Sequence, residues 1–258
     1  MLCGMSKLGV KDVILAMLLL CPFLALAGQE NDANLVIIDA MKSASYSRGF
    51  EVRLKISTTN SDRVDVIKVS VIGEFLSTRK RLLIRGISPI SIFNHLVVAE
   101  QIGTDTYKIV ESDGKTEDRK IRSDPFVKIF SSDLILWDFF EPWWQWPKQI
   151  IGSKKYVDSH ECTSIKSQTE NQKLPVREIV SCIDSEGKIS LHTEFYDGHH
   201  RLLRTVEVEK TMVKESLTKV AKVMSVCAMA DVKSVIELYG GDEHYEINAD
   251  TFSLLEIR

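Results

Sequence analysis

"EVRLKISTTNSDRVDVIKVSVIG", residues 51–73, carries the pattern that decides the fold of this chain. Apolar and polar side chains alternate through residues 51–57 and again through residues 67–71. A period of two is typical of antiparallel strands that bury one face. We therefore predict two such strands, whose alternating apolar positions are Val52, Leu54, Ile56, Ile67, Val69 and Val71. The period does not say which face of a strand is turned towards the interior.

The same pattern recurs along most of the chain. Further strands are expected at residues 79–87, 94–103, 106–112, 154–167, 176–184, 188–197, 201–210, 217–226 and 232–240. Turn residues such as Asp113-Gly114 and Asp197-Gly198 separate them. Roughly ten or eleven short strands in hairpin succession predict one long antiparallel sheet that curls. Such a sheet must either close on itself or have its apolar face covered.

Two segments are candidates for that cover. Residues 31–46 read as the one clear helix, with Asp32 or Asn34 as its cap and Leu35, Ile38 and Met41 on one face. The second candidate is the aromatic segment, residues 136–152, in which two prolines exclude a regular strand. It holds all four tryptophans of the chain, and its large aromatic residues are Trp137, Phe139, Phe140, Trp143, Trp144 and Trp146.

Two interpretations of the aromatic segment stay open. A plug of buried tryptophans closes the end of a core and needs no ligand. A lid or wall would instead border a cavity for a hydrocarbon chain, whose transfer out of water is worth about 0.8 kcal/mol per methylene. Such a cavity has a volume of roughly several hundred Å³ and is lined by apolar side chains.

The first 27 residues have the pattern of an export signal. Lys7 and Lys11 precede an apolar run that ends in Ala25-Leu26-Ala27, which predicts a signal peptide cleaved after Ala27. The run is shorter than the roughly 20 residues that span a bilayer. A retained anchor and a lipid-modified Cys21 are the alternatives, but leucines precede Cys21 where lipoprotein processing requires a small residue. We expect residues 28–258 to form a single domain, because no linker or internal repeat divides them.

Three cysteines follow the expected cleavage site. Cys162 and Cys182 flank residues 168–175 almost symmetrically, at the expected ends of a hairpin. They are a candidate disulfide in an exported protein, and two half-buried thiols are the alternative. Cys227 has no obvious partner, and we expect it to be packed.

Nothing in the sequence indicates catalysis, a metal or a cofactor. The motifs Gly-x-Ser-x-Gly, His-Glu-x-x-His, Cys-x-x-Cys and a Walker-type glycine loop are absent from the chain. His199 and His200 are adjacent, so they point to opposite faces and form a poor metal chelate. A formal net charge of −3 gives no footprint for nucleic acid. The basic cluster at residues 79–85 alternates between two faces, which favours a solvated edge strand over a specific anion site.

The order of several segments resembles that of a known family. These segments are "GEFLSTRKRLLIRGISP" (73–89), "SSDLILWDFFEPWWQWPKQIIGSKKYVDSHECTSIKS" (131–167), "REIVSCIDSEGKISLHTEFYDGHHRLLRTVEVEK" (177–210) and "ADTFSLLEIR" (249–258). Together they resemble outer-membrane lipoprotein-sorting proteins of the LolA-like superfamily. The resemblance covers most of residues 73–209, is weaker before residue 73, and is nearly absent from residues 211–248.

The resemblance implies a mainly β (α+β) fold and a transport function. The expected fold is a strongly curved antiparallel sheet forming a half-open barrel, covered by the N-terminal helix and the aromatic-rich lid segment. Such proteins carry acyl chains of lipoproteins or lipids through the periplasm towards the outer membrane, and their partners include inner- and outer-membrane transport components. Without a convincing lipobox, the membrane-anchored acceptor form is disfavoured. A non-catalytic envelope sensor or protein-interaction domain on the same fold is the alternative. The expected lipid-binding residues are the aromatic side chains of residues 136–146 and the six alternating strand positions named above.

Overall fold

The computed structural model divides the chain into two compact units, Met1–Ala40 and Met41–Arg258. The structure describes residues 38–39, 41, 47–61, 63–116, 118–130, 132–158, 160–184, 189–214, 217–228 and 230–256. Ile38, Asp39 and Met41 are helical, and the rest of the expected helix at residues 31–46 lies outside the described residues, as does the expected signal peptide. No helix in the described part of the chain is long and apolar enough to cross a membrane.

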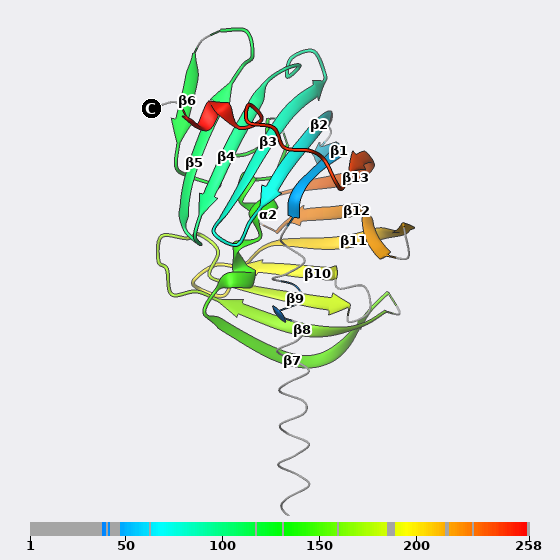
Figure 1. Ribbon diagram of the computed structural model, residues 1–258. Coiled ribbons are helices and arrows are strands. Elements are labelled where there is room, and N and C mark those ends of the chain that lie inside the picture. The colour runs from blue at the N-terminus through cyan, green and yellow to red at the C-terminus, as the bar shows by residue number, and fades with distance from the viewer. Residues whose placement is uncertain are drawn as a thin grey trace, which may run out of the picture. The chain divides into compact units, whose positions relative to one another are not determined.

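The described residues of the second unit form one antiparallel sheet of 13 strands (Figure 1). The strands are β1 (Ser47–Asn60), β2 (Arg63–Phe75), β3 (Arg79–Ser88), β4 (Leu96–Ile102), β5 (Thr106–Ser112), β6 (Arg119–Arg122), β7 (Lys148–Val157), β8 (His160–Gln168), β9 (Glu178–Asp184), β10 (Ile189–Tyr196), β11 (Leu202–Lys214), β12 (Leu217–Cys227) and β13 (Val232–Asp242). The order across the sheet is β6-β5-β4-β3-β2-β1-β13-β12-β11-β10-β9-β8-β7. The sheet is therefore open within the described residues, with β6 and β7 as its edges.

Short helices occupy the connections at two places in this unit. They are α2 (Leu136–Phe140) and η1 (Pro142–Gln145) between β6 and β7, and η2 (Ser253–Glu256) after β13. Figure 1 shows the strand direction turning between β2–β6 and β7–β10, with α2 in the bend. Side chains from β3 and β11 both contact α2, so the sheet bends around this helix. The mainly β, antiparallel sheet predicted from the sequence is thus present.

The register of β1 and β2 places the six alternating apolar residues on one face. Val52 lies opposite Val71, Leu54 opposite Val69, and Ile56 opposite Ile67. Direct cross-strand partners point to the same side of a sheet. Four of the six are buried, namely Ile56, Ile67, Val69 and Val71. The predicted alternation therefore separates an inner face of the sheet from an outer one.

Two local expectations were wrong, and one strand was missed. Residues 154–167 are not one strand, because the left-handed backbone of Asp158 (φ 45°) turns β7 into β8. Residues 148–152 belong to β7 rather than to a cover. The strand β6 was not predicted, since its sequence RKIR is exposed throughout and lacks the alternating apolar face that the prediction required.

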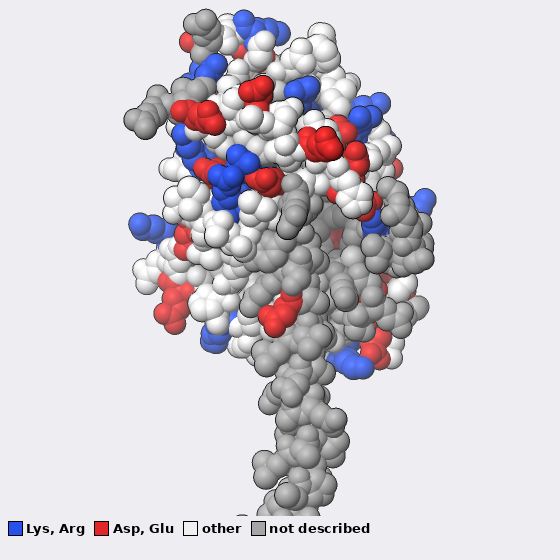
Figure 2. Space-filling view, viewed as in Figure 1, with Lys and Arg blue, Asp and Glu red and all other residues white. Residues whose placement is uncertain are grey.

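The basic cluster of residues 79–85 also differs from its expectation. Its strand, β3, is not an edge but pairs with β2 and β4. Lys80 is buried, and Arg81 pairs with Glu74 at 2.5 Å. Lys80 and Arg81 thus have different partners, the Phe140 carbonyl for Lys80 and Glu74 for Arg81. On the face of the molecule shown in Figure 2, basic and acidic side chains are interspersed.

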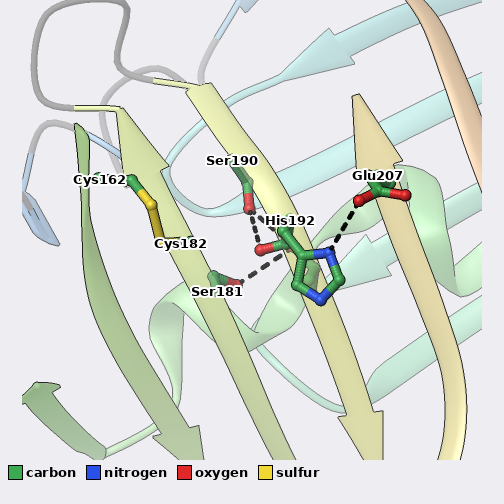
Figure 3. The surroundings of a disulfide bond; sticks show 7 residues. Cys162, Ser181, Cys182, Ser190, His192 and Glu207 are labelled. Carbon is green, nitrogen blue, oxygen red and sulfur yellow. Dashed lines mark hydrogen bonds and ion pairs between the residues drawn. A yellow bond between two sulfur atoms is a disulfide. The ribbon is translucent and has the colours of Figure 1, made fainter. Parts of the chain in front are cut away.

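A disulfide links β8 to β9 (Figure 3). It joins Cys162 to Cys182, the pair that the sequence singled out, with their Cα atoms 5.4 Å apart. The two residues are diagonal neighbours rather than direct partners, since Cys162 lies opposite Asp184 and Cys182 opposite Ser164. The bond therefore ties together two strands near the β7 edge of the sheet. Cys227, which was expected to be packed, is a half-buried free thiol.

Candidate functional site

A pocket of about 420 Å³ lies between the inner face of the sheet and the aromatic segment. Most of its lining is apolar, and the residues are Met41 and others from β1, β10–β13 and the chain from Leu134 to Trp144. The lining residues are Met41, Leu54, Leu134, Asp138, Phe139, Glu141, Trp143, Trp144, Ile189, Ser190, Thr193, Phe195, Arg204, Val206, Val208, Val220, Val223, Ser225 and Ile236. Pockets of this size and character are typical small-molecule sites.

Aliphatic side chains form one side of the pocket floor. Ile236 on β13 lies opposite Val223 on β12, which in turn lies opposite Val208 on β11. On the other side of β13, Ile236 pairs with Ile56 of β1. This row continues the inner face defined by β1 and β2. The apolar face that the sequence predicted is therefore the one that looks into the pocket.

Small hydroxyl residues form the next row of the floor, which we call the hydroxyl row. It runs through Thr58, Ser234, Ser225, Val206, Thr193 and Ser181, each opposite the next across β1, β13, β12, β11, β10 and β9. Val206 is its one member without a hydroxyl, and Ser225, Val206 and Thr193 are the members that line the pocket. Thr58 and Ser234 hydrogen-bond to each other at 3.0 Å, and the Thr193 hydroxyl lies 2.7 Å from the Ser190 hydroxyl. Hydrogen bonding compensates the burial of these hydroxyls. Their small size leaves space where large apolar side chains would fill the interior.

The aromatic segment is fixed above this floor by polar side chains of the sheet. Arg204 on β11 donates from both terminal nitrogens to the Asp138 carboxylate, with Nη1 and Oδ2 2.7 Å apart. Asp138 also accepts a hydrogen bond from the backbone N–H of Ile135, which caps the start of α2. Gln149 donates to the carbonyls of Trp143 and Trp146, at 2.9 and 3.1 Å. Such bidentate and charge-assisted contacts set a specific geometry.

The tryptophans pack against one another and against the sheet. The ring centroid of Trp137 lies 5.1 Å from that of Trp143 and 5.4 Å from that of Phe126. Trp143 meets Phe195 of β10 edge-on, at 5.6 Å and 89°. Edge-to-face and offset arrangements of this kind are the favourable ones for aromatic pairs. The segment is therefore a packed cluster.

Comparison with known proteins gives a fold but no sequence family. No family model and no curated protein matches the chain. Among solved structures, a DUF1329 family protein from Desulfovibrio piger has a TM-score of 0.78 at 13% identity, over 87% of this chain and 98% of the other. An outer membrane lipoprotein-sorting protein domain from Vibrio parahaemolyticus has a TM-score of 0.74 at 10% identity, over 83% and 94%. A LolA superfamily protein from Nitrosomonas europaea has 0.67 at 12%, over 84% and 96%. This chain has a LolA-like fold. At these identities the likeness concerns the fold alone.

Within the LolA-like fold, the expected lipid-binding residues divide into two groups. Four of the twelve line the pocket, namely Leu54, Phe139, Trp143 and Trp144. Trp137, Phe140, Trp146, Ile56, Ile67, Val69 and Val71 are buried without lining it, and Val52 is half-buried. The aromatic segment thus combines features of both open interpretations, because part of it fills the interior and part of it borders a hollow.

Sequence reasoning missed most of the pocket floor. Val206 and Val208 on β11 belong to an alternation that the sequence shows, but nothing in it places β11 near β1. One signal was available. Arg204 shares the alternation of these two valines, which places a charged side chain on the same face as the apolar ones. A charge on an apolar face indicates a buried partner, which here is Asp138.

Glu141 is the most unusual residue of the site. It joins α2 to η1 with left-handed backbone angles (φ 46°, ψ 52°), a conformation that costs a residue with a side chain about 1–2 kcal/mol. Its side chain lines the pocket. Burial raises the pKa of Glu141, while the nearby Lys80 opposes that rise. Burial likewise lowers the pKa of Lys80 to about 8.

The four indole N–H groups are a second unusual feature. All four are buried, and none has a hydrogen-bond acceptor among the described residues. The indole of Trp144 lies close enough to Glu141 to lower its pKa, although the N–H lacks the geometry of a hydrogen bond. Buried unpaired donors are rare and call for a structural reason. Two of these tryptophans, Trp143 and Trp144, border the pocket.

Proposed function

We propose that this protein is a periplasmic carrier that binds the acyl chains of lipoproteins or lipids and delivers them towards the outer membrane. In this proposal the helix expected at residues 31–46 and the aromatic segment cover a half-open barrel, and residues 28–258 act as one non-catalytic domain. The proposed lipid-binding residues are those of the sequence analysis together with the pocket-lining residues of β10–β13. Transport components of the inner and outer membranes are the proposed partners.

The apolar pocket is the observation that carries this proposal. Its floor consists of aliphatic and small side chains, and its wall contains Phe139, Trp143 and Trp144. An acyl chain of about ten methylenes gains roughly 8 kcal/mol on leaving water for such a site, before the cost of ordering the chain. The LolA-like fold supports the same interpretation. The pattern of residues 1–27 supports export.

Ligand-dependent stability tests the proposal directly. The protein is purified from the periplasmic fraction of an expressing bacterium, stripped of lipid, and heated with and without an acylated lipopeptide. A ligand that binds only the folded state raises its stability, by about 2.7 kcal/mol at a ligand concentration 100 times the Kd. We therefore expect a higher melting temperature, together with a change in tryptophan fluorescence because two tryptophans border the pocket.

Mass spectrometry of the organic extract identifies what the protein carries before stripping. Acylated molecules in stoichiometric amount are the expected result. No stabilisation by any acylated ligand, with a co-purifying protein in place of lipid, would reject the carrier and favour the sensor or protein-interaction alternative. Recovery of the protein only in the cytoplasmic fraction would reject the proposed location.

A further inference from the structure

Three charged residues interrupt the apolar lining of the pocket: Asp138, Glu141 and Arg204. Two of them neutralise each other, because the Arg204 guanidinium is held by both oxygens of Asp138 and also lies over the Phe195 ring, 4.5 Å from its centroid. Glu141 forms no ion pair within the described part of the chain. The charge left facing the pocket is therefore the carboxyl group of Glu141.

The backbone conformation of Glu141 is unusual for a residue with a long side chain. A left-handed residue at the end of a helix is most often glycine, which adopts that conformation without strain. Here the position holds Glu141 (φ 46°), one of the residues that line the apolar pocket. Strained residues of this kind concentrate at ligand-binding and other functional sites.

Among the charged groups around Glu141, Lys80 favours its ionised form and Asp138 opposes it. Asp138 comes from α2, Arg204 from β11 and Lys80 from β3. The Lys80 ammonium donates to the Phe140 carbonyl at 2.7 Å and lies 5.1 Å from the centre of the Phe75 ring, and Lys80 does not line the pocket. Its charge opposes the effect of burial and of Asp138 on the pKa of Glu141. Lys80, which does not line the pocket, thus favours the ionised form of Glu141, which does.

We propose that the Glu141 carboxylate binds the amine head group of an amphiphile whose hydrocarbon chain occupies the apolar part of the pocket. This inference rests on the proposed function and adds the chemical class of the ligand. An ammonium group donates charge-assisted hydrogen bonds to a carboxylate. It is also attracted to tryptophan rings, and Trp144 lies beside Glu141. An anionic head group would be repelled by the Glu141 carboxylate.

Three probes with the same twelve-carbon chain and different head groups test this proposal. Dodecylamine, dodecanol and dodecanoate are titrated into the stripped protein at pH 7, below micelle formation, and the Kd is measured by tryptophan fluorescence and calorimetry. We expect dodecylamine to bind about tenfold more tightly than dodecanol, as one charge-assisted contact provides. Dodecanoate should bind more weakly than dodecanol.

Two variants assign the preference to one carboxyl group. Glu141→Gln keeps the shape of the side chain and should bring dodecylamine to the affinity of dodecanol, while dodecanol itself binds as before. Glu161→Gln removes the same charge from the exposed end of β8, where Glu161 pairs with Lys154, and should leave the whole series unchanged. If E141Q does not fold, a pH titration of ligand binding to the wild-type protein tests the same carboxyl group. As the pH falls through the raised pKa of Glu141, the amine preference should disappear and dodecanol affinity should remain.

The outcomes separate this inference from the proposed function. Equal affinity for the three probes, or a preference for dodecanoate, overturns amine recognition and leaves the acyl carrier intact. Failure of all three probes to bind overturns the carrier and this inference with it. A second pair of probes identifies the source of the amine: an ethanolamine-headed lysolipid and a lipopeptide with a free amino group, each compared with its N-acetylated form. Loss of affinity on acetylation supports the proposal for that source, and unchanged affinity for both overturns it.

Discussion

At the scale of the residue, Glu141 lines the pocket, and Lys80, which does not line it, carries a nearby opposite charge. Both are desolvated, and each opposes the effect of burial on the pKa of the other. Removing water from a charge is unfavourable unless a partner compensates it. The compensation here is partial, because the two groups form no direct ion pair among the described residues and Lys80 uses a backbone carbonyl as its acceptor. Such an arrangement keeps a carboxylate available for a ligand.

The lowered pKa of Lys80 makes stability depend on pH in a defined direction. Lys80 has a pKa of about 8 in the folded protein and 10.5 in the reference state. Between these values the unfolded chain binds a proton that the folded protein does not, so the free energy of unfolding rises with pH. We expect wild type to gain roughly 3 kcal/mol relative to Lys80→Met between pH 7.5 and 10.5. Urea unfolding at several pH values measures this difference.

The comparison with Lys80→Met isolates this residue from the others that titrate. Tyr196 acts in the opposite direction at higher pH, because burial raises its pKa to about 12 and its proton is held in the folded state. That contribution is common to both proteins and cancels. Parallel stability curves for wild type and variant would show that Lys80 has an ordinary pKa, and the support it gives to Glu141 would then be absent.

The sequence could not predict this role of Lys80. Alternation in residues 79–85 indicated only that Lys80 and Arg81 point to opposite faces. What decides their surroundings is the position of β3 inside the sheet and the carbonyl of Phe140, which lies 60 residues further along the chain. A polar residue on a strand is exposed or buried according to what covers that strand. The cover is not encoded in the strand itself.

At the scale of the element, the aromatic segment serves both as core and as pocket wall. Its irregular backbone and its tendency to be buried could be predicted, because prolines and clustered tryptophans are visible in the sequence. Which of its residues fill the core and which border the pocket could not be predicted. It depends on Arg204 and Gln149, which hold the segment in one position over β10 and β11. Trp137 thereby packs among aromatic rings, while Trp144 borders the pocket.

A matched pair of substitutions separates the two roles. We expect Trp144→Phe to weaken dodecanol binding about fivefold, a loss of roughly 1 kcal/mol of contact with the chain. Trp137→Phe should leave that affinity unchanged. Both variants should change the free energy of unfolding by only about 1 kcal/mol, because the lost packing is offset by removal of a buried N–H that lacks an acceptor. Calorimetric titration and urea unfolding measure the two quantities on the same samples.

Two other outcomes of these substitutions would contradict the prediction. If both variants bind dodecanol as wild type does, the segment acts as a plug and contributes no wall to the ligand site. If both lose affinity equally, the tryptophans act as one packed unit, and the separation of Trp137 from the pocket is wrong.

At the scale of the whole second unit, the pocket depends on the pairing of β1 with β13. Most strands neighbour their predecessor in sequence, and apart from the β5–β6 and β7–β8 pairs those hairpins were predicted from turns and alternation. The β1–β13 pair joins residues far apart in the chain, such as Ile56 and Ile236. It brings β11, β12 and β13 beside β1 and so assembles the pocket floor. Local patterns carry no information on such long-range pairing, which is why the floor was missed. Residues 211–248, where the family resemblance nearly vanishes, supply several of its side chains.

A hollow interior distinguishes a carrier from a domain that has the same sheet and a filled core. Filling the space should therefore have opposite effects on stability and on binding. Val223 is half-buried and lines the pocket, so Val223→Phe places a ring in empty space. We expect its free energy of unfolding to equal or exceed that of wild type, because added apolar area is buried without displacing neighbours. Dodecanol binding should be lost, since the ring occupies the volume that the chain requires.

Val69 provides the matched control for this test. It is fully buried on β2 and does not line the pocket. Val69→Phe forces the same ring into a packed region, which typically costs about 1–3 kcal/mol. Thermal and urea unfolding should therefore rank Val69→Phe well below wild type and Val223→Phe at or above it. If the two variants are equally destabilised and Val223→Phe still binds dodecanol, the space beside Val223 is not the ligand site. The acyl-carrier proposal would then fall, although the LolA-like sheet would stand.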